Sequence, residues 1–258
     1  MARLQSETTV TVRGRIIGGE KPLVCVPVLA VETLALLDQA MALVPTAPDL
    51  VEWRADAYGA LDNTPACLHS LERLRFIIGD IPLIVTCRAA EEGGMQALPL
   101  QLRLTFMHAA MQSGLPDLID IELGSPRDFI AAIQATAARC GVRQILSYHD
   151  FAGTPGQAVI VDKLMQAQAW GADIAKVAVM PNSYQDVLTL LGAVYQARSG
   201  GLKIPMAAMS MGGRGVVTRI AGALFGSDIT FAAGFALSAP GQIPIADLRL
   251  AMSLLQTE

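Results

Sequence analysis

The feature that most constrains the fold is a strict alternation of short apolar runs with longer helix-like segments. Eight runs of strand length each precede a segment with helical periodicity. The predicted strands are 23–28, 50–56, 83–88, 118–123, 144–150, 174–180, 206–211 and 230–233, and the predicted helices are 32–43, 66–78, 99–113, 127–140, 155–170, 184–198, 215–225 and 245–255. Such alternation is typical of parallel strands joined by helices.

Eight such units in 258 residues favour an α/β fold of the closed (β/α)8 type, a TIM barrel, over an open sheet. No G-x-G-x-x-G follows a predicted strand, so the main signal of a dinucleotide-binding sheet is missing. An N-terminal β-hairpin, 9–13 with 15–18, is expected to close the bottom of the barrel. Without a linker or low-complexity segment, residues 1–258 are predicted to form a single domain. Thr154 and Pro155 are expected to open the fifth helix.

Composition excludes several function classes. The chain is 52% hydrophobic, but no stretch of about 18 residues is free of strongly polar residues, so no membrane span is expected. A net charge of −4 argues against a nucleic-acid partner. The four cysteines are widely spaced, which argues against a disulfide framework or a metal site and fits a reducing cytoplasm. The first residues contain no apolar core typical of a signal peptide.

Within ADIAKVAVMP, residues 172–181, Lys176 stands in the middle of the apolar run 174–180 and is the charged residue of that run. A buried ammonium loses its hydration, which costs free energy unless the group is paired or neutral. Lys176 is therefore either a structural lysine held by a carboxylate or an amine kept neutral by burial and neighbouring cations, able to attack a ketone. Ala178, one step nearer the barrel mouth, would leave room for a substrate.

Other charged residues collect where the predicted strands end, at the edge where barrel enzymes place their active sites. They are Glu52, Arg54, Arg88, Glu122, His149 and Asp150, with Glu91 and Glu92 in a following loop. His149 is either a packed core histidine or a general acid and base beside Lys176, with Glu92 holding its imidazole. His69 and His108 fall in helical segments and are expected to be surface or packing residues.

The arginines suit an anionic, hydroxylated ligand, because guanidinium binds carboxylate through two parallel hydrogen bonds. Arg54, Arg88 and Arg219 are the candidates. The glycine-rich turn before Arg219 could cradle a phosphate instead, but no second glycine-rich loop supports that reading. Ser238 and Gln242 flank a Pro-Gly turn that is either a plain turn or a lid over the substrate.

Together these segments resemble type I 3-dehydroquinate dehydratases. The matching stretches, in chain order, are VEWRAD (51–56), VTCRAAEEGG (85–94), DLIDIEL (117–123), SYHDF (147–151), DIAKVAVMP (173–181), MSMGGRGVVTRIAG (209–222) and SAPGQIPIADLR (238–249). The resemblance implies a (β/α)8 barrel of the shikimate pathway, commonly a homodimer, that needs no metal or organic cofactor. Its reaction converts 3-dehydroquinate to 3-dehydroshikimate through a lysine imine.

The resemblance also implies a role for each candidate residue. Lys176 would form the Schiff base, and His149, oriented by Glu92, would move the protons. The substrate would be held by Glu52, Arg54, Arg88, Arg219, Ser238 and Gln242, with Arg219 on its carboxylate. Two rival functions stay open: a class I aldolase, whose usual sugar-phosphate substrates need a firm phosphate site, and a catalytically silent barrel that only binds a ligand.

Overall fold

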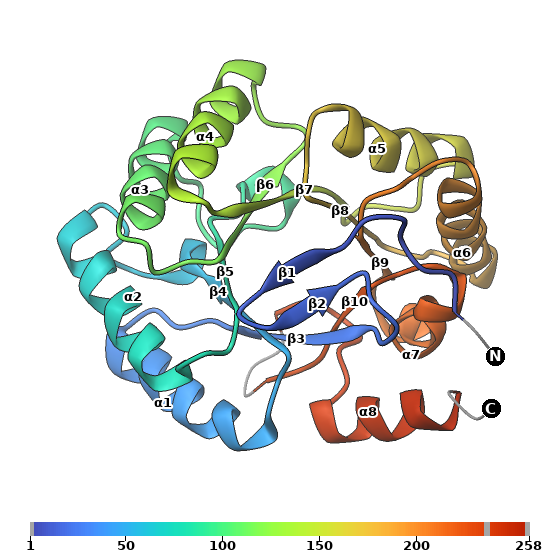
Figure 1. Ribbon diagram of the computed structural model, residues 1–258, viewed down its shortest axis with the longest axis horizontal. Coiled ribbons are helices and arrows are strands. Elements are labelled where there is room, and N and C mark those ends of the chain that lie inside the picture. Colours follow the sequence, from blue (N-terminus) through green and yellow to red (C-terminus); the bar gives the residue numbers. More distant parts are fainter. Residues whose placement is uncertain (1–2, 235–237, 256–258) are drawn as a thin grey trace.

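The computed structural model describes residues 3–234 and 238–255. Within them, eight parallel strands form a closed barrel in which the last strand pairs with the first (Figure 1). The strands are β3 (Leu23–Val28), β4 (Leu50–Arg54), β5 (Leu83–Thr86), β6 (Leu118–Glu122), β7 (Arg143–Asp150), β8 (Ile174–Val179), β9 (Met206–Ser210) and β10 (Ile229–Phe231). The predicted (β/α)8 barrel is confirmed.

A helix follows each barrel strand and covers the outside of the sheet. The helices are α1 (Thr33–Leu43), α2 (Thr64–Ile78), α3 (Leu100–Gln112), α4 (Arg127–Cys140), α5 (Gln157–Ala169), α6 (Tyr184–Ser199), α7 (Val216–Phe225) and α8 (Ile245–Leu254). In α4, for example, Phe129, Ile133 and Ala137 recur at four-residue spacing and are all buried, so one apolar stripe docks the helix. No helix in the described ranges is long and apolar enough to span a bilayer.

The predicted start of the fifth helix is wrong. Helix α5 begins at Gln157, after Gly156, rather than at Pro155. Thr154 does not cap the helix, because its hydroxyl donates to the carbonyl of Met180 instead (2.9 Å). The loop after β7 is thereby fastened to the residue that follows β8, close to the barrel mouth.

The N-terminal hairpin closes the bottom of the barrel, as predicted. Strands β1 (Val10–Val12) and β2 (Arg15–Ile17) pair antiparallel through a turn in which Arg13 and Gly14 both have positive φ. Figure 1 shows the hairpin lying across the barrel. Its buried side chains join one apolar cluster with residues in the first half of the barrel strands: Leu50, Ile84, Leu118, Ile145 and Ile174.

The inside of the barrel changes from apolar to polar one step above this cluster. Because side chains alternate along a strand, the second residue after each of those five also points inward. These residues are Glu52, Thr86, Asp120, Ser147 and Lys176, and all five are buried. The barrel therefore carries a layer of polar and charged side chains directly beneath its carboxyl-terminal mouth.

Candidate active site

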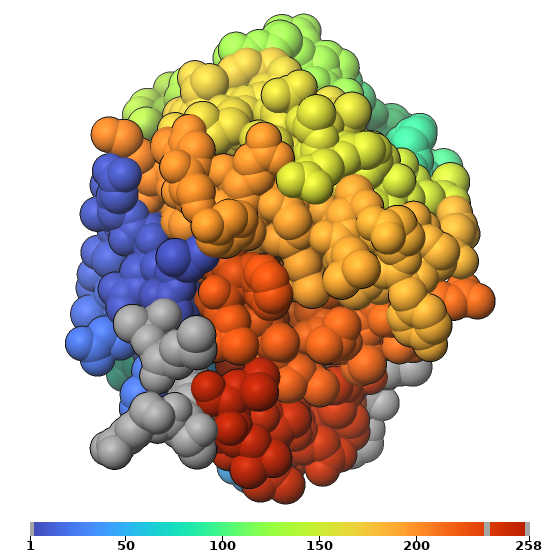
Figure 2. All heavy atoms as spheres, turned by 90° about the vertical axis from the view of Figure 1, so that its right-hand side faces the viewer, coloured from blue at the N-terminus to red at the C-terminus, as the bar shows by residue number. Residues whose placement is uncertain are grey.

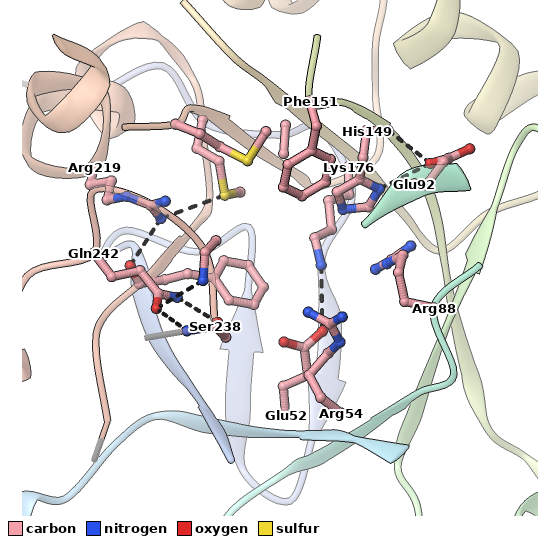
Figure 3. Close-up of a pocket in the computed structure, with 15 residues that line it drawn as sticks. Glu52, Arg54, Arg88, Glu92, His149, Phe151, Lys176, Arg219, Ser238 and Gln242 are labelled. Atoms are coloured by element: carbon pink, nitrogen blue, oxygen red, sulfur yellow. Dashed lines mark hydrogen bonds and ion pairs between the residues drawn. The ribbon is translucent and has the colours of Figure 1, made fainter. Parts of the chain in front are cut away.

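A pocket lies on this polar layer at the carboxyl ends of the strands (Figure 3). Every site residue predicted from the sequence lines it: Glu52, Arg54, Arg88, Glu92, His149, Lys176, Arg219, Ser238 and Gln242. The remaining wall is mostly apolar and consists of Phe151, Ala178, Met209, Met211, Phe231 and Ala239. Ala178 lies toward the mouth from Lys176 and lines the pocket, at the position where the sequence predicts room for a substrate.

Lys176 is buried and surrounded by carboxylates. Its Nζ lies 2.7 Å from Asp120 Oδ2 and 3.6 Å from Glu52 Oε1. The same nitrogen sits 4.5 Å from the centre of the Phe231 ring, close enough for a cation–π contact. Of the two alternatives predicted from the sequence, these contacts fit a lysine held by a carboxylate, because its nearest charged partners are anions. An amine attacks a ketone only in its unprotonated form, so Lys176 needs a route by which a proton can leave its nitrogen.

Asp120 belongs to the site by its contacts, although the sequence did not single it out. Its carboxylate accepts hydrogen bonds from Lys176, from Arg88 Nη2 (2.9 Å) and from Ser147 Oγ. Burial alone would raise the pKa of Asp120, but Arg88 and Lys176 outweigh it and hold the pKa far below its ordinary value. The signal in the sequence was the inward spacing of Asp120 and Glu122 within the otherwise apolar run LIDIEL.

Arg54 and Arg88 line the pocket, yet carboxylates of the protein already engage both guanidinium groups. Arg54 makes a bidentate pair with Asp56 (2.9 and 2.8 Å). Arg88 bridges Asp120 and Glu122, and these acids raise its pKa although burial opposes them. Both arginines thus form part of a fixed charged wall.

His149 and Glu92 form a hydrogen-bonded pair across two elements. The backbone N–H of His149 donates to Glu92 Oε2 (2.8 Å), and the ring Nδ1 lies 3.1 Å from the same oxygen. Burial, together with the charges of Arg88 and Lys176, lowers the pKa of His149 well below its ordinary value. The imidazole is therefore neutral near pH 7 and can accept a proton.

Glu92 has the opposite perturbation. Burial raises its pKa from 4.5 to about 7; Glu122 and Asp120 add to this, while Arg88 and the His149 N–H oppose it. When ionised, Glu92 accepts from Nδ1–H and leaves Nε2 of His149 free to take a proton. When protonated, it can donate to Nδ1 and favour the other tautomer.

From the raised pKa of Glu92 we predict how the free energy of unfolding depends on pH. Folding favours the protonated form of Glu92, so its contribution is present below about pH 4.5 and is lost as the pH rises through about 7. The difference in the free energy of unfolding between Glu92→Gln and the parent protein should therefore shift in favour of the variant by about 2 to 3 kcal/mol as the pH rises from 5 to 8. Urea unfolding at both pH values measures it. The exposed neighbour Glu91, changed to Gln, is the control, and an equal pH response in both variants contradicts the prediction.

Arg219 stands apart from the other arginines of the pocket. It is almost fully buried, and within the described residues it forms no ion pair with a carboxylate. Its Nη atoms donate to the carbonyls of Phe231 and Pro240 (both 3.1 Å), and Nε has no partner in the described part of the chain. Burial lowers its pKa to about 10, which still leaves it positive near pH 7. A buried cation without an anion is suited to an anionic ligand.

The segment 238–242 is fastened over the pocket beside Arg219. Gln242 Oε1 accepts from the Ser238 N–H (2.9 Å), and its Nε2 donates to Ser238 Oγ (2.8 Å). Pro240 accepts from both Arg219 and the Gly212 N–H (3.0 Å). Gly241, with φ of +76°, approaches Gly212 so closely that a Cβ there would collide with its carbonyl. The Ser238 and Gln242 side chains are thereby held at the mouth.

The described residues contain no group of three or more His, Cys, Asp or Glu arranged to hold a metal ion. All four cysteines are free, and Cys25 and Cys87 are buried core residues. The fold and the pocket together define a (β/α)8-barrel enzyme with a buried lysine and a buried neutral histidine at the carboxyl ends of its strands.

Comparison with known proteins specifies this class further. The family described as Type I 3-dehydroquinase matches residues 24–258. A 3-dehydroquinate dehydratase from Geobacillus thermodenitrificans is 43% identical over 252 residues, which cover 97% of each chain. The crystal structure of the enzyme from Geobacillus kaustophilus aligns with a TM-score of 0.94 and 43% identity, over 97% of each chain. That of the type I enzyme from Clostridium difficile aligns with a TM-score of 0.93 and 36% identity, over 96% of this chain and 98% of that one. The chain belongs to the type I 3-dehydroquinase family, and its relatives of that name are hydro-lyases.

Proposed function

We propose that this protein removes water from 3-dehydroquinate to give 3-dehydroshikimate through an imine on Lys176, in the shikimate pathway. The observation that carries the proposal is that one pocket holds Lys176, the neutral His149 and the carboxylate-free guanidinium of Arg219. Loss of a hydroxyl β to a ketone needs an electron sink, a proton carrier and a clamp for the substrate's charge. These three side chains supply one each.

The first stage forms the imine. The Lys176 ammonium gives up a proton to solvent, and the neutral amine attacks the C3 ketone. The carbinolamine hydroxyl then takes a proton from solvent and leaves as water, which gives a protonated imine and leaves His149 neutral. The protonated imine withdraws electrons more strongly than the ketone does. Asp120, ionised beside Arg88, stabilises the positive nitrogen before and after this step.

The second stage is the elimination. Nε2 of His149 takes a proton from C2, and the electron pair of that C–H bond moves into the iminium to give an enamine. The enamine expels the C1 hydroxyl, which takes the proton from His149 and leaves as water. Hydrolysis of the resulting conjugated imine releases 3-dehydroshikimate and restores the Lys176 amine. Glu92, on Nδ1, keeps the imidazole in the tautomer that this sequence requires.

Arg219 and the segment 238–242 place the substrate for these steps. The substrate carboxylate would supply the anion that Arg219 lacks, and Ser238 and Gln242 would donate to its oxygens from above. Glu52 faces Lys176 and the pocket, and is placed to accept from a substrate hydroxyl. The Clostridium difficile structure, with covalently modified comenic acid, supports a covalent route in a close relative.

The test is to trap the intermediate. Incubation with 3-dehydroquinate and borohydride is expected to leave a reduced adduct on the peptide that contains Lys176, seen by mass spectrometry, while the untreated enzyme shows rising enone absorbance. A folded protein with neither an adduct nor enone formation would overturn the proposal. Retro-aldol products in place of the enone would favour the aldolase.

We also propose that the protein acts in the cytoplasm as a homodimer. Four free cysteines are compatible with a reducing compartment, and the dimer follows only from the resemblance to the family. Light scattering coupled to size exclusion would measure the mass, and a monomer of 27.3 kDa would contradict the dimer.

A further inference from the structure

A buried arginine from outside the barrel pairs with a carboxylate of the barrel wall. Arg103 lies in the first turn of α3, the helix that covers β5 and β6 (Figure 1), and only 5% of it is exposed. Its Nη2 donates to Glu122 Oε2, and its Nε donates to the carbonyl of Cys87 (2.9 Å). The Phe129 ring lies 5.4 Å from its guanidinium carbon. These contacts hold the guanidinium against Glu122 in one orientation.

Glu122 connects this arginine to the catalytic lysine. Its other oxygen, Oε1, accepts from Arg88 Nη1 (3.0 Å) and from the Ala89 N–H (3.1 Å). Arg88 in turn pairs with Asp120, which holds Lys176. An alternating chain of charges thus runs from α3 through the barrel wall to Lys176, and every contact in it is buried.

Glu122 also faces Glu92. Both carboxylates line a groove on the outer side of the wall, which Arg103 and Gly124 line as well. A Cβ at Gly124 would lie 2.9 Å from Glu92 Oε1, so the glycine leaves room for that oxygen. The charged groups that act on Glu92 are Arg88 from the loop after β5 and Asp120 and Glu122 from β6, and the backbone N–H of His149 on β7 adds a hydrogen bond. Among these groups, only Glu122 is also paired with a cation from outside the barrel.

We propose that Arg103 is a positioning residue that acts through Glu122: it neutralises that carboxylate and so keeps the neighbouring Glu92 available to hold His149. Removing the Arg103 charge would leave Glu122 with a surplus negative charge facing Glu92. Like charges disfavour ionisation, so Glu92 would be protonated over a wider pH range. This inference rests on the proposed roles of Glu92 and His149.

The test is the pH profile of Arg103→Met, which keeps the length and apolar stem of the side chain. The acid limb of kcat/KM is expected near pH 7 in the parent protein, where Glu92 titrates. In the variant it should move upward by about one pH unit, which lowers kcat/KM about fivefold at pH 7. A ¹³C NMR titration of the Glu92 carboxyl should show the same shift.

Three further variants make the result decisive. Arg103→Lys keeps the charge and should restore most of the parent profile. Glu122→Gln removes the negative charge and should move the limb in the opposite, acid direction, which tests the same coupling if Arg103→Met does not fold. Arg198→Met removes an equally buried arginine from its pair with Asp228, at the other end of the barrel, and should lower stability without moving the profile.

The outcomes separate the two proposals. If the parent protein has no dehydratase activity, the proposed function fails, while the NMR titration still tests Arg103. If the parent is active and Glu92 titrates at the same pH with and without the Arg103 charge, the role of Arg103 is overturned. Equal profile shifts in Arg103→Met and Arg198→Met also overturn it, because loss of stability would then explain both.

Discussion

Replacing Lys176 by methionine is expected to lower kcat for 3-dehydroquinate by about 10⁴-fold or more and to abolish the borohydride adduct. The side chain keeps its length and apolar stem, so the packing around β8 should survive. Asp120 would keep Arg88 and Ser147 as hydrogen-bond partners, so the loss of the ammonium does not leave it unpaired. The barrel should therefore stay folded without the nucleophile.

The measurement is enone absorbance under saturating substrate, with circular dichroism to verify the fold. Lys163→Met is the matched control, because this lysine on α5 does not line the pocket. Its Nζ lies 5.2 Å from the centre of the Tyr148 ring. Turnover within tenfold of the parent would exclude an imine on Lys176. Wholesale unfolding would instead identify Lys176 as a structural lysine held by Asp120.

The second large effect is expected for His149→Ala, which should form the imine yet lower kcat by about 10³-fold. The neutral imidazole is the carrier of the C2 proton, and without it the iminium has no base in position. Lys176 and Asp120 stay in place, so borohydride should still trap substrate on the protein. Mass spectrometry of the reduced complex and the rate of enone formation measure the two stages separately.

His69→Ala, on the exposed surface of α2, is the control for this variant. If enone formation survives in His149→Ala, the proton carrier is another residue. If neither enone nor adduct forms, His149 is also needed to deprotonate Lys176 before imine formation.

Much of the fold could be predicted from the chain because barrel strands and surface helices have different hydrophobic periods. The run LIVTCR is short and apolar, as expected for a strand covered on both faces, whereas α4 repeats its apolar residues at helical spacing. The start of α5 was misjudged because Thr154 has a second use, as a donor to Met180. A side chain that can cap a helix can equally bond a neighbouring loop, and local sequence does not decide between them.

The candidate site was predictable to the level of which residues approach the mouth. Strand position alone brings Lys176 and His149 to one edge, since parallel strands all end there. Their partners were less predictable, because pairing depends on the register between strands. Ser147 lies beside Lys176 in the ladder between β7 and β8, whereas Asp120 lies beside Ile145 in the ladder between β6 and β7. The carboxylate of Asp120 nevertheless accepts from both Ser147 and Lys176.

The sequence by itself determined the barrel, the N-terminal hairpin that closes its bottom and the set of polar residues at its mouth, because these follow from periodicity and chain order. Only the tertiary structure decided which charged residues of that set pair with one another. It placed Asp120 and Glu52 against Lys176, paired Arg54 and Arg88 with carboxylates of the barrel wall, and gave Arg219 no carboxylate partner among the described residues. The physical reason is that pairing and burial depend on distances in space between segments far apart along the chain, and these two quantities control ionisation.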